Sequence, residues 1–422
     1  MKNPKGILIL KHDDGNGRHE QLLHPLCADL SQVELTPGGL RSLRAAAAIL
    51  HPEVMKPIPE SFDPDYKNPC WLDGSGMLSC LPAFYVAGVF HAGCSTLYQK
   101  LLRHPDILSD ASSMNQMWGE EAKTMSGYLD NFNTAKQAVA RDPARKLIAD
   151  GSSSTFAQYW SAALKAHRGF QGTVVPCFAK CGNTAGATQV PAATCQETTC
   201  FSSAHQADLE VSRKSGIPFD RMHVPLLMRA VYGSRPPRLV VLARNPIQRL
   251  HSAYYCYQHY HSKYGRNAQG FLAYVEEQLN AFHKCVSKGH TERECVLYFE
   301  TYGMEEERVH YHADQIFRGM YSVFLELWLQ ALPASHIHVV KSEEYFANAS
   351  ATIGSVVSFL GLAQPGQEQL QEMLAAGRPR SFTAGMPAML PEARAILLKF
   401  YKPYNTRLAE LLHDPRYLTW NV

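Results

Sequence analysis

Four short apolar segments, each followed by a turn and a helical pattern, constrain the fold of this 422-residue chain more than any other feature. Each segment has the length of a buried strand, and most of the stretches that follow carry apolar residues at helical spacing. The strands are expected at Phe84–Phe90, Leu147–Asp150, Leu239–Ala243 and His336–Val340. Buried strands that alternate with helices predict an α/β fold with a central parallel sheet that is covered on both faces.

The pattern of helices and loops divides the chain into two parts. Residues 1–65 lack sustained periodicity apart from a short helix at Leu40–Leu50, so we interpret them as an N-terminal extension of a domain at 66–422. Residues 169–215 are rich in small residues and cysteine and are expected to form a long surface insertion held by crosslinks. Helices are expected at Thr96–Arg103, Ser154–Leu164, Ile247–Tyr260, Phe271–Cys285, Ile316–Leu332, Ala351–Leu360 and Pro391–His413.

The composition excludes several classes of protein. Hydrophobic residues make up 45% of the chain and charged residues 19%, which is not the composition of a disordered protein. The formal net charge is only +3, whereas a general nucleic-acid binder needs a concentrated basic surface. The longest early apolar run, Gly6–Leu10, is too short for a membrane span or a signal peptide. We therefore expect a globular domain without a membrane span that binds any anion locally.

The cysteines indicate crosslinks. The chain has 11 cysteines, and three pairs are close in sequence: Cys70 with Cys80, Cys195 with Cys200, and Cys285 with Cys295. This pattern favours disulfides and an oxidising lumen, and the sequon Asn348–Ser350 is compatible with a secretory route. An odd count leaves at least one free thiol, for which Cys94 is the candidate.

A zinc site is the alternative reading of four of these cysteines. Cys177 and Cys181 precede Cys195 and Cys200 at spacings that a zinc cluster can use. No histidine lies within those short spacings, so disulfides are the favoured interpretation.

The segment His91–Thr96 follows the first predicted strand and has the features of an anion-binding turn. Gly93 allows close backbone approach, Ser95 and Thr96 offer hydroxyl donors, and a helix N-terminus follows at once. No lysine precedes the Ser/Thr pair, so the nucleoside-triphosphate pattern GxxxxGK[ST] is absent. The alternative is that the turn merely starts a helix.

A second candidate anion site ends the third predicted strand. Arg244 is the last residue of that segment, and Ser252 follows about two turns into the next helix, which Pro246 is suited to begin. An arginine there can hold a phosphate through two hydrogen bonds, although many strand-end arginines only form salt bridges or caps. Two strand ends with anion donors indicate a ligand that carries anions at two places.

These motifs together resemble the Golgi carbohydrate sulfotransferases, which use 3′-phosphoadenosine 5′-phosphosulfate (PAPS). The resemblance covers about Tyr66–Trp420 and is closest to the N-acetylgalactosamine 4-sulfate 6-O-sulfotransferases that act on chondroitin. It lies in the order and spacing of several segments: Lys67–Trp71, Cys80–Pro82, Leu97–Asp106, Leu242–Tyr255, Arg318–Tyr321, Lys341–Tyr345 and Phe400–Asn405.

The resemblance implies a P-loop-like sulfotransferase fold with a central parallel sheet, flanking helices and the Cys-rich insertion. It further implies PAPS as co-substrate without a metal, a carbohydrate acceptor and a Golgi or secretory location. It also implies that Cys285 and Cys295 form a disulfide hairpin. By matching position, Gly93, Cys94, Ser95 and Thr96 hold the 5′-phosphosulfate, Arg244 and Ser252 hold the 3′-phosphate, and His91 meets the charge of the leaving group.

Two positions depart from the family pattern. The family has a lysine at the position of His91, and it has a Lys-Glu pair, whose glutamate is the base, where this chain has Met114. A histidine with an ordinary pKa of about 6.5 can replace that lysine only when it is protonated. The expected activity is therefore weaker and more sensitive to pH than in the family.

Two other functions are the alternatives if these two departures abolish sulfuryl transfer. One is a catalytically silent relative that binds nucleotide or sulfated glycan. The other is a nucleotide kinase in which Asp150 holds magnesium at a strand end.

Two further segments are candidates for ligand contact. Ser152–Thr155 is either an acceptor-facing segment or a helix cap, and Arg378–Phe382 is a loop that could contact adenosine or a glycan.

Overall fold

The computed structural model describes most of the predicted domain. It covers residues 37–110, 115–118, 124–157, 168–184, 192–215, 223–299, 302, 309, 315–377 and 385–422. Within these ranges every helix is too short or too polar to span a bilayer. The predictions for Met114, Arg378–Phe382, residues 158–164 and most of the N-terminal extension fall outside the described residues.

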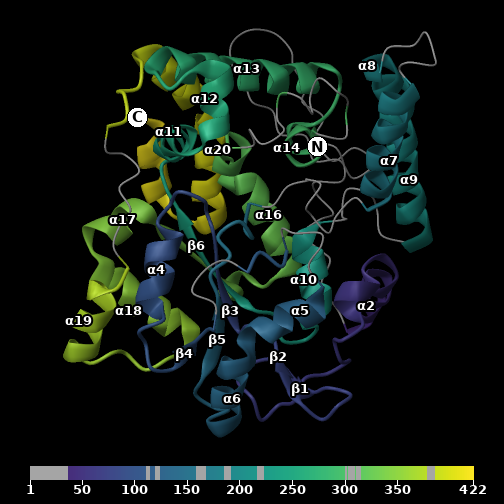
Figure 1. Ribbon diagram of the computed structural model, residues 1–422. Helices are drawn as coiled ribbons and strands as arrows, with labels where there is room; N and C mark the ends of the chain where they lie inside the picture. The colour runs from purple at the N-terminus through teal and green to yellow at the C-terminus, as the bar shows by residue number, and fades with distance from the viewer. Residues whose placement is uncertain are drawn as a thin grey trace, which may run out of the picture.

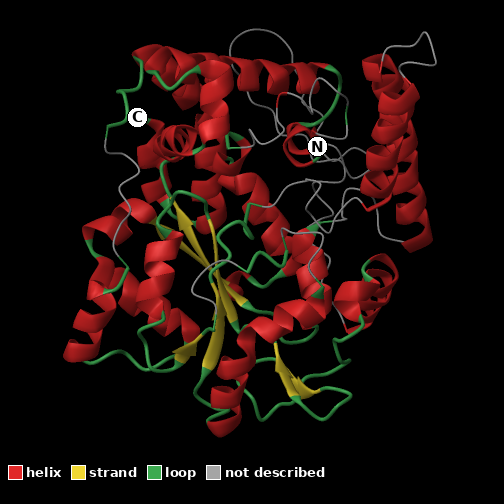
Figure 2. Cartoon of the chain, in the orientation of Figure 1, coloured by secondary structure: helices red, strands yellow, loops and turns green. Residues whose placement is uncertain are grey.

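A five-stranded parallel sheet forms the centre of the molecule (Figure 2). Its strands lie in the order β4–β5–β3–β6–β7, and β3 pairs with β5 on one side and β6 on the other. Every residue of β3 and β5 is buried, as expected for strands covered on both faces. The bounds are β3 (Phe84–Gly88), β4 (Ile107–Leu108), β5 (Leu147–Asp150), β6 (Arg238–Ala243) and β7 (Ile337–Lys341).

Helices cover both sides of this sheet (Figure 1). The helix α4 (Cys94–Leu101) packs beside α19 (Gln367–Ala375), which in turn contacts α18 (Ala349–Leu360). The helix α16 (Tyr321–Ala331) contacts α10 (Val224–Tyr232) and the long C-terminal helix α20 (Pro391–Leu412). The predicted α/β architecture with a central parallel sheet and flanking helices is therefore confirmed.

The remaining elements surround this core. A small antiparallel hairpin precedes β3, and its strands are joined by the Cys70–Cys80 disulfide. The other elements are α2 (Pro37–Leu50), α3 (Pro52–Met55), β1 (Cys70–Leu72), β2 (Leu78–Cys80), α5 (Met125–Leu129), α6 (Asn133–Arg141), α11 (Pro246–Cys256), α12 (Gln258–Tyr264), α13 (Ala268–Ser287), α14 (Glu292–Leu297) and α17 (Ser342–Ala347).

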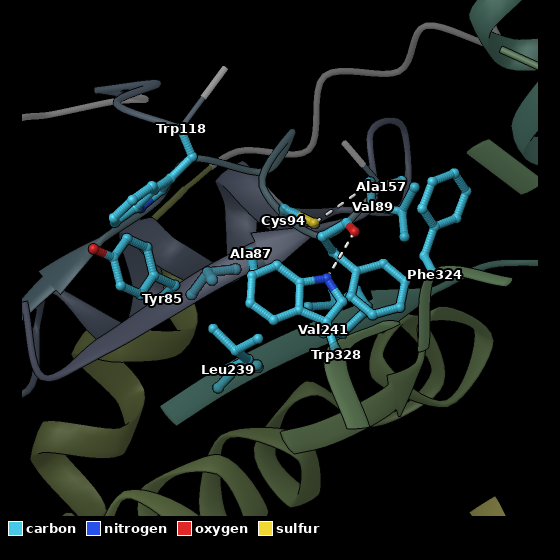
Figure 3. Close-up of a cluster of buried hydrophobic side chains, with 14 of the residues drawn as sticks. Tyr85, Ala87, Val89, Cys94, Trp118, Ala157, Leu239, Val241, Phe324 and Trp328 are labelled. Atoms are coloured by element: carbon cyan, nitrogen blue, oxygen red, sulfur yellow. Dashed lines mark hydrogen bonds between the residues drawn. The ribbon is translucent and has the colours of Figure 1, made fainter. Parts of the chain in front are cut away.

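Aromatic side chains of α16 bury the face of the sheet that lies beneath the first loop. Phe324 and Trp328 lie near Leu239 and Val241 of β6 (Figure 3). The Trp328 indole Nε1 donates a hydrogen bond to the carbonyl oxygen of Phe156, 2.8 Å away. This contact satisfies the one polar atom of a fully buried ring and fixes the segment that follows β5.

Two helix predictions need correction. The stretch from Ser154 to 157 forms turns rather than the start of a helix, because the Phe156 N–H donates to Ala87 of β3 and keeps the segment against the sheet. The helix expected at Ile247–Tyr260 is two helices, α11 and α12, because Tyr257 between them adopts an extended conformation with ψ 115°.

The Cys-rich insertion is a crosslinked helical hairpin that stands apart at one side of the molecule (Figure 1). It contains α7 (Arg168–Thr184), α8 (Ala192–Cys195) and α9 (Phe201–Ser215), with a separate small core that includes Phe170 and Phe201. Its α9 contacts α2 of the main body.

Two disulfides crosslink this hairpin, as the sequence analysis expected without assigning their pairing. Cys177 bonds Cys200, and Cys181 bonds Cys195, so the sequence neighbours Cys195 and Cys200 do not pair with each other. Side chains on one face of a helix point in the same direction, whereas those of two facing helices point toward each other and can be bridged. The sulfurs of Cys177, Cys181 and Cys200 also lie within 4.8 Å of one another, but in this oxidised structure they are committed to disulfides.

Candidate functional site

The loop between β3 and α4 forms a tight turn at the carboxyl end of the central strand. His91 and Gly93 both have left-handed backbones, with φ of 64° and 100°, and Gly93 is the N-cap of α4. A Cβ atom at Gly93 would lie 2.8 Å from Cζ of Phe346, so only glycine fits this turn without a shift. The turn thus directs the N-terminus of an eight-residue helix toward the edge where ligands of α/β sheets bind.

Arg244 and Ser252 both reach this loop. The Arg244 Nη1 donates a hydrogen bond to the carbonyl oxygen of His91 at 3.1 Å. The Ser252 hydroxyl lies 3.4 Å from the His91 Nδ1. The structure therefore brings together, at His91, the residues that the sequence analysis placed after two separate strands.

The N-terminus of α17 forms hydrogen bonds with both loops, the one that follows β3 and the one that follows β6. The Ser342 hydroxyl donates to the carbonyl oxygen of Ala92, 2.8 Å away. The backbone N–H of Asn245 donates to Glu343 Oε1 at the same distance, 2.8 Å. A single short helix therefore holds both loops in register, which fixes the spacing between Arg244 and the glycine turn.

The site has a local excess of positive charge. Burial, together with the nearby guanidinium groups of Arg249, Arg244 and Arg318, lowers the pKa of His91 to about 3. Arg249 is fully buried, and its Nη1 donates to Gln315 Oε1 at 3.0 Å. In the ligand-free protein His91 is consequently neutral, and three arginines surround it. Such an arrangement suits an anionic ligand with more than one negative charge.

The other loop residues take different orientations. The Cys94 thiol points into the core, donates to the carbonyl oxygen of Val89 at 3.2 Å, and has its pKa raised to about 12 by burial (Figure 3). Cys94 can therefore serve a ligand only through its backbone. Ser95 is exposed and Thr96 is half-buried in the first turn of α4, so both hydroxyls remain within reach of a ligand.

Asp150 at the end of β5 is a buried structural group. Its Oδ2 accepts a 2.6 Å hydrogen bond from the Tyr128 hydroxyl, and its Oδ1 accepts one of 2.7 Å from the backbone N–H of Ser152. Burial raises its pKa, and the residue has no exposed surface. This environment does not favour the magnesium-holding role that the kinase alternative requires, because both oxygens already have protein donors.

Comparisons with known proteins find a sulfotransferase domain match over part of this chain. The sulfotransferase domain family matches residues 173–377, a span that includes Arg244 and Ser252. That match supports the sulfotransferase family. The parallel sheet with flanking helices has the architecture expected of this domain, whereas the loop at His91–Thr96 precedes the matched span.

Several curated sulfotransferases are similar in sequence to this chain. Carbohydrate sulfotransferase 15 of Homo sapiens is 24% identical over 345 residues, and that of Mus musculus is 25% identical over 347. Each alignment covers 80% of this chain, and the chain spans about half the length of these relatives, 54%. The protein of the same name from Nototodarus sloanii is 29% identical over 145 residues, 34% of this chain and 86% of that protein.

A solved bacterial structure was also matched. The sulfotransferase from Alicyclobacillus acidocaldarius aligns over 79% of this chain and 96% of its own, with 14% identity and a TM-score of 0.37.

Sequence reasoning missed three residues of this candidate site. Arg249 lies three residues before Ser252 and therefore on the same face of α11, a spacing that could have revealed it. Arg318 and Glu343 are brought to the site by folding over long sequence separations, and although both lie in segments that resemble the family, no local pattern marks their roles.

Proposed function

We propose that this protein transfers a sulfuryl group from PAPS to a hydroxyl group of a carbohydrate. The observation that carries the proposal is the meeting of Arg244 and Ser252 at His91, which joins two strand ends into one cationic site. The match to the sulfotransferase domain and the similarity to carbohydrate sulfotransferases support the same reaction.

The donor set fits a nucleotide with two anionic groups. The turn at Gly93 and the hydroxyls of Ser95 and Thr96 at the start of α4 would receive the 5′-phosphosulfate, as would the backbone of Cys94. Arg244 and Ser252 would receive the 3′-phosphate. PAPS supplies the activated sulfuryl group, and the surrounding arginines offset the charge of its phosphates.

His91 is our candidate for the group that meets the leaving phosphate. In the transfer, the bond between sulfur and the phosphate oxygen breaks while the acceptor oxygen bonds to sulfur and releases its proton to solvent water. The leaving phosphate gains negative charge, which a protonated imidazole stabilises. We propose that the anions of the bound donor oppose the three arginines and raise the pKa of His91 above the value of about 3 that it has in the free protein.

The acceptor class and the cellular location are finer parts of the proposal. We infer a glycosaminoglycan-like acceptor from the order of motifs that the chain shares with the chondroitin-modifying group. We infer a Golgi or other secretory lumen from the four disulfides, since such bonds persist in oxidising compartments.

Transfer of labelled sulfate tests this function. The protein is incubated with PAPS carrying labelled sulfate and with desulfated chondroitin, and the label in the polysaccharide is measured beside a His91→Ala control. Transfer by the wild-type protein above that control supports the proposal. Background transfer by both, together with intact binding of adenosine 3′,5′-bisphosphate, would instead identify a silent nucleotide-binding relative.

A further inference from the structure

An aromatic and cationic cluster lies directly beside His91. The rings of Phe90 and Tyr257 stack with centroids 6.2 Å apart and planes 28° apart. The guanidinium carbon of Arg318 lies over the Phe90 ring, 5.7 Å from its centroid. The Tyr257 ring also meets the His91 ring edge-on at 5.6 Å. We call Phe90, Tyr257 and Arg318 the aromatic platform.

Three separate elements build this platform. Phe90 follows β3 and immediately precedes His91, Tyr257 is the extended residue between α11 and α12, and Arg318 lies in the 3₁₀ turn Phe317–Gly319 before α16. All three residues are only half-buried, although the neighbouring Val89, Tyr260 and Phe317 are buried. The break in the predicted helix at Tyr257 is what places its ring at this position.

The platform differs chemically from the donor site. The donor groups at Gly93, Ser95, Thr96 and Ser252 are amides and hydroxyls that suit phosphate, whereas Phe90 and Tyr257 offer partly exposed aromatic rings. Aromatic faces bind the C–H faces of pyranose rings, and an adjacent guanidinium pairs with a carboxylate or sulfate. A sugar ring bound here would also lie next to His91, where the sulfuryl group is transferred.

We propose that the aromatic platform is the acceptor subsite and that it binds a pyranose ring of an anionic glycan, with Arg318 paired to the acid group of that sugar. This inference rests on the proposed function, since it assigns the acceptor side of the same site. The competing occupant is the adenine ring of the donor, which could stack on the same aromatic faces.

Binding measurements on the full chain separate these occupants. The probes are a chondroitin hexasaccharide, the same hexasaccharide with its carboxylates reduced to alcohols, and adenosine 3′,5′-bisphosphate. The variants are Tyr257→Ala, Tyr257→Phe and Arg318→Gln. The matched control is Arg238→Gln, since Arg238 forms a similar pair with Phe359, 6.0 Å to the ring centroid, at the opposite end of β6.

The platform predicts a specific pattern. Tyr257→Ala raises the Kd of the chondroitin hexasaccharide about tenfold, whereas Tyr257→Phe and Arg238→Gln leave it within about twofold. Arg318→Gln raises the Kd of the hexasaccharide about tenfold and leaves that of the carboxyl-reduced probe unchanged. Tyr257→Ala leaves the Kd of adenosine 3′,5′-bisphosphate unchanged.

Two results would overturn the inference. One is unchanged hexasaccharide affinity in both Tyr257→Ala and Arg318→Gln. The other is a loss of adenosine 3′,5′-bisphosphate affinity in Tyr257→Ala, which would assign the platform to adenine. If the wild-type protein binds the hexasaccharide through the platform but binds no adenosine 3′,5′-bisphosphate, the platform stands as a glycan-binding site, while its role as an acceptor subsite and the proposed function both fail.

Discussion

The Arg244 guanidinium donates a hydrogen bond to the His91 carbonyl oxygen, 3.1 Å away, and thereby joins the carboxyl ends of β6 and β3. The same arginine lowers the pKa of the His91 side chain. The contact that assembles the cationic site therefore also helps burial and Arg249 to keep the His91 ring neutral. We propose that binding of the donor and protonation of His91 are coupled through this pair.

The turn at Gly93 should be intolerant of a side chain. Gly93→Ala places an alanine in a left-handed conformation and brings its Cβ atom within 2.8 Å of the Phe346 ring. Gly76→Ala is the control, because Gly76 is also left-handed, with φ of 80°, but has open space around it. We expect Gly76→Ala to cost about 1 kcal/mol of unfolding free energy and Gly93→Ala clearly more, with weaker binding of adenosine 3′,5′-bisphosphate only for Gly93→Ala. Denaturant unfolding and calorimetry measure both, and equal effects of the two variants would contradict the assigned turn.

Replacing His91 by lysine should restore the cation that the family has at this position. Burial among three arginines keeps the His91 imidazole neutral, but lysine starts from a much higher pKa and stays charged over a wider pH range. We expect His91→Lys to raise the turnover number and to flatten its dependence on pH between about 5 and 8. Steady-state sulfate transfer across that range is the measurement, and an identical profile for both proteins would remove His91 from the leaving-group role.

The lowered pKa of His91 also predicts a loss of stability in acid. Below about pH 6.5 the unfolded chain binds a proton at this residue, whereas the folded ligand-free protein does not until about pH 3. The free energy of unfolding contributed by this site therefore falls as the pH decreases from 6.5 toward 3. Urea unfolding should show a smaller acid loss for His91→Asn than for the wild type, and a loss of equal size would mean that His91 is solvated.

The disulfides of the insertion should stabilise only the insertion. The hairpin has its own small core, separate from the core around the sheet. Unfolding of the hairpin is therefore expected to leave the anion-binding loops in place. We expect Cys177→Ala/Cys200→Ala to speed protease cleavage within 168–215 while binding of adenosine 3′,5′-bisphosphate is unchanged. The matched change Cys285→Ala/Cys295→Ala should instead destabilise the main domain by about 2–4 kcal/mol, because this pair lies in the main core. Equal loss of nucleotide binding in both variants would show that the hairpin supports the site.

Local patterns in the sequence predicted the central sheet because each strand is a short apolar run. The segment Leu147–Asp150 is a strand at the predicted bounds, and Leu239–Ala243 differs from β6 by one residue at its start. The strand β4 escaped prediction, since its two residues carry too little pattern to separate from a loop. The turn after β5 was read as a helix because its hydrogen bond to Ala87 is a tertiary contact that no periodicity records.

The position of the candidate site was predictable from residues that lie next to the predicted strands in the sequence. Gly93, Arg244 and Ser252 follow strands, and strand ends of a parallel sheet meet at one edge. The neutral state of His91 was not predictable, because it results from burial and from arginines that folding brings together over long separations. The free thiol expected at Cys94 is confirmed, whereas Cys256 is a second free thiol among the described residues.

Calorimetric titration with adenosine 3′,5′-bisphosphate, comparing the wild-type protein with Arg244→Gln, tests the central claim most directly. The account predicts saturable binding by the wild type and a loss of at least about tenfold in affinity for the variant, since a charge-assisted hydrogen bond contributes about 1.5–3 kcal/mol. Equal affinity in the two proteins, or stabilisation of the wild type by ATP with magnesium but not by this nucleotide, would contradict it.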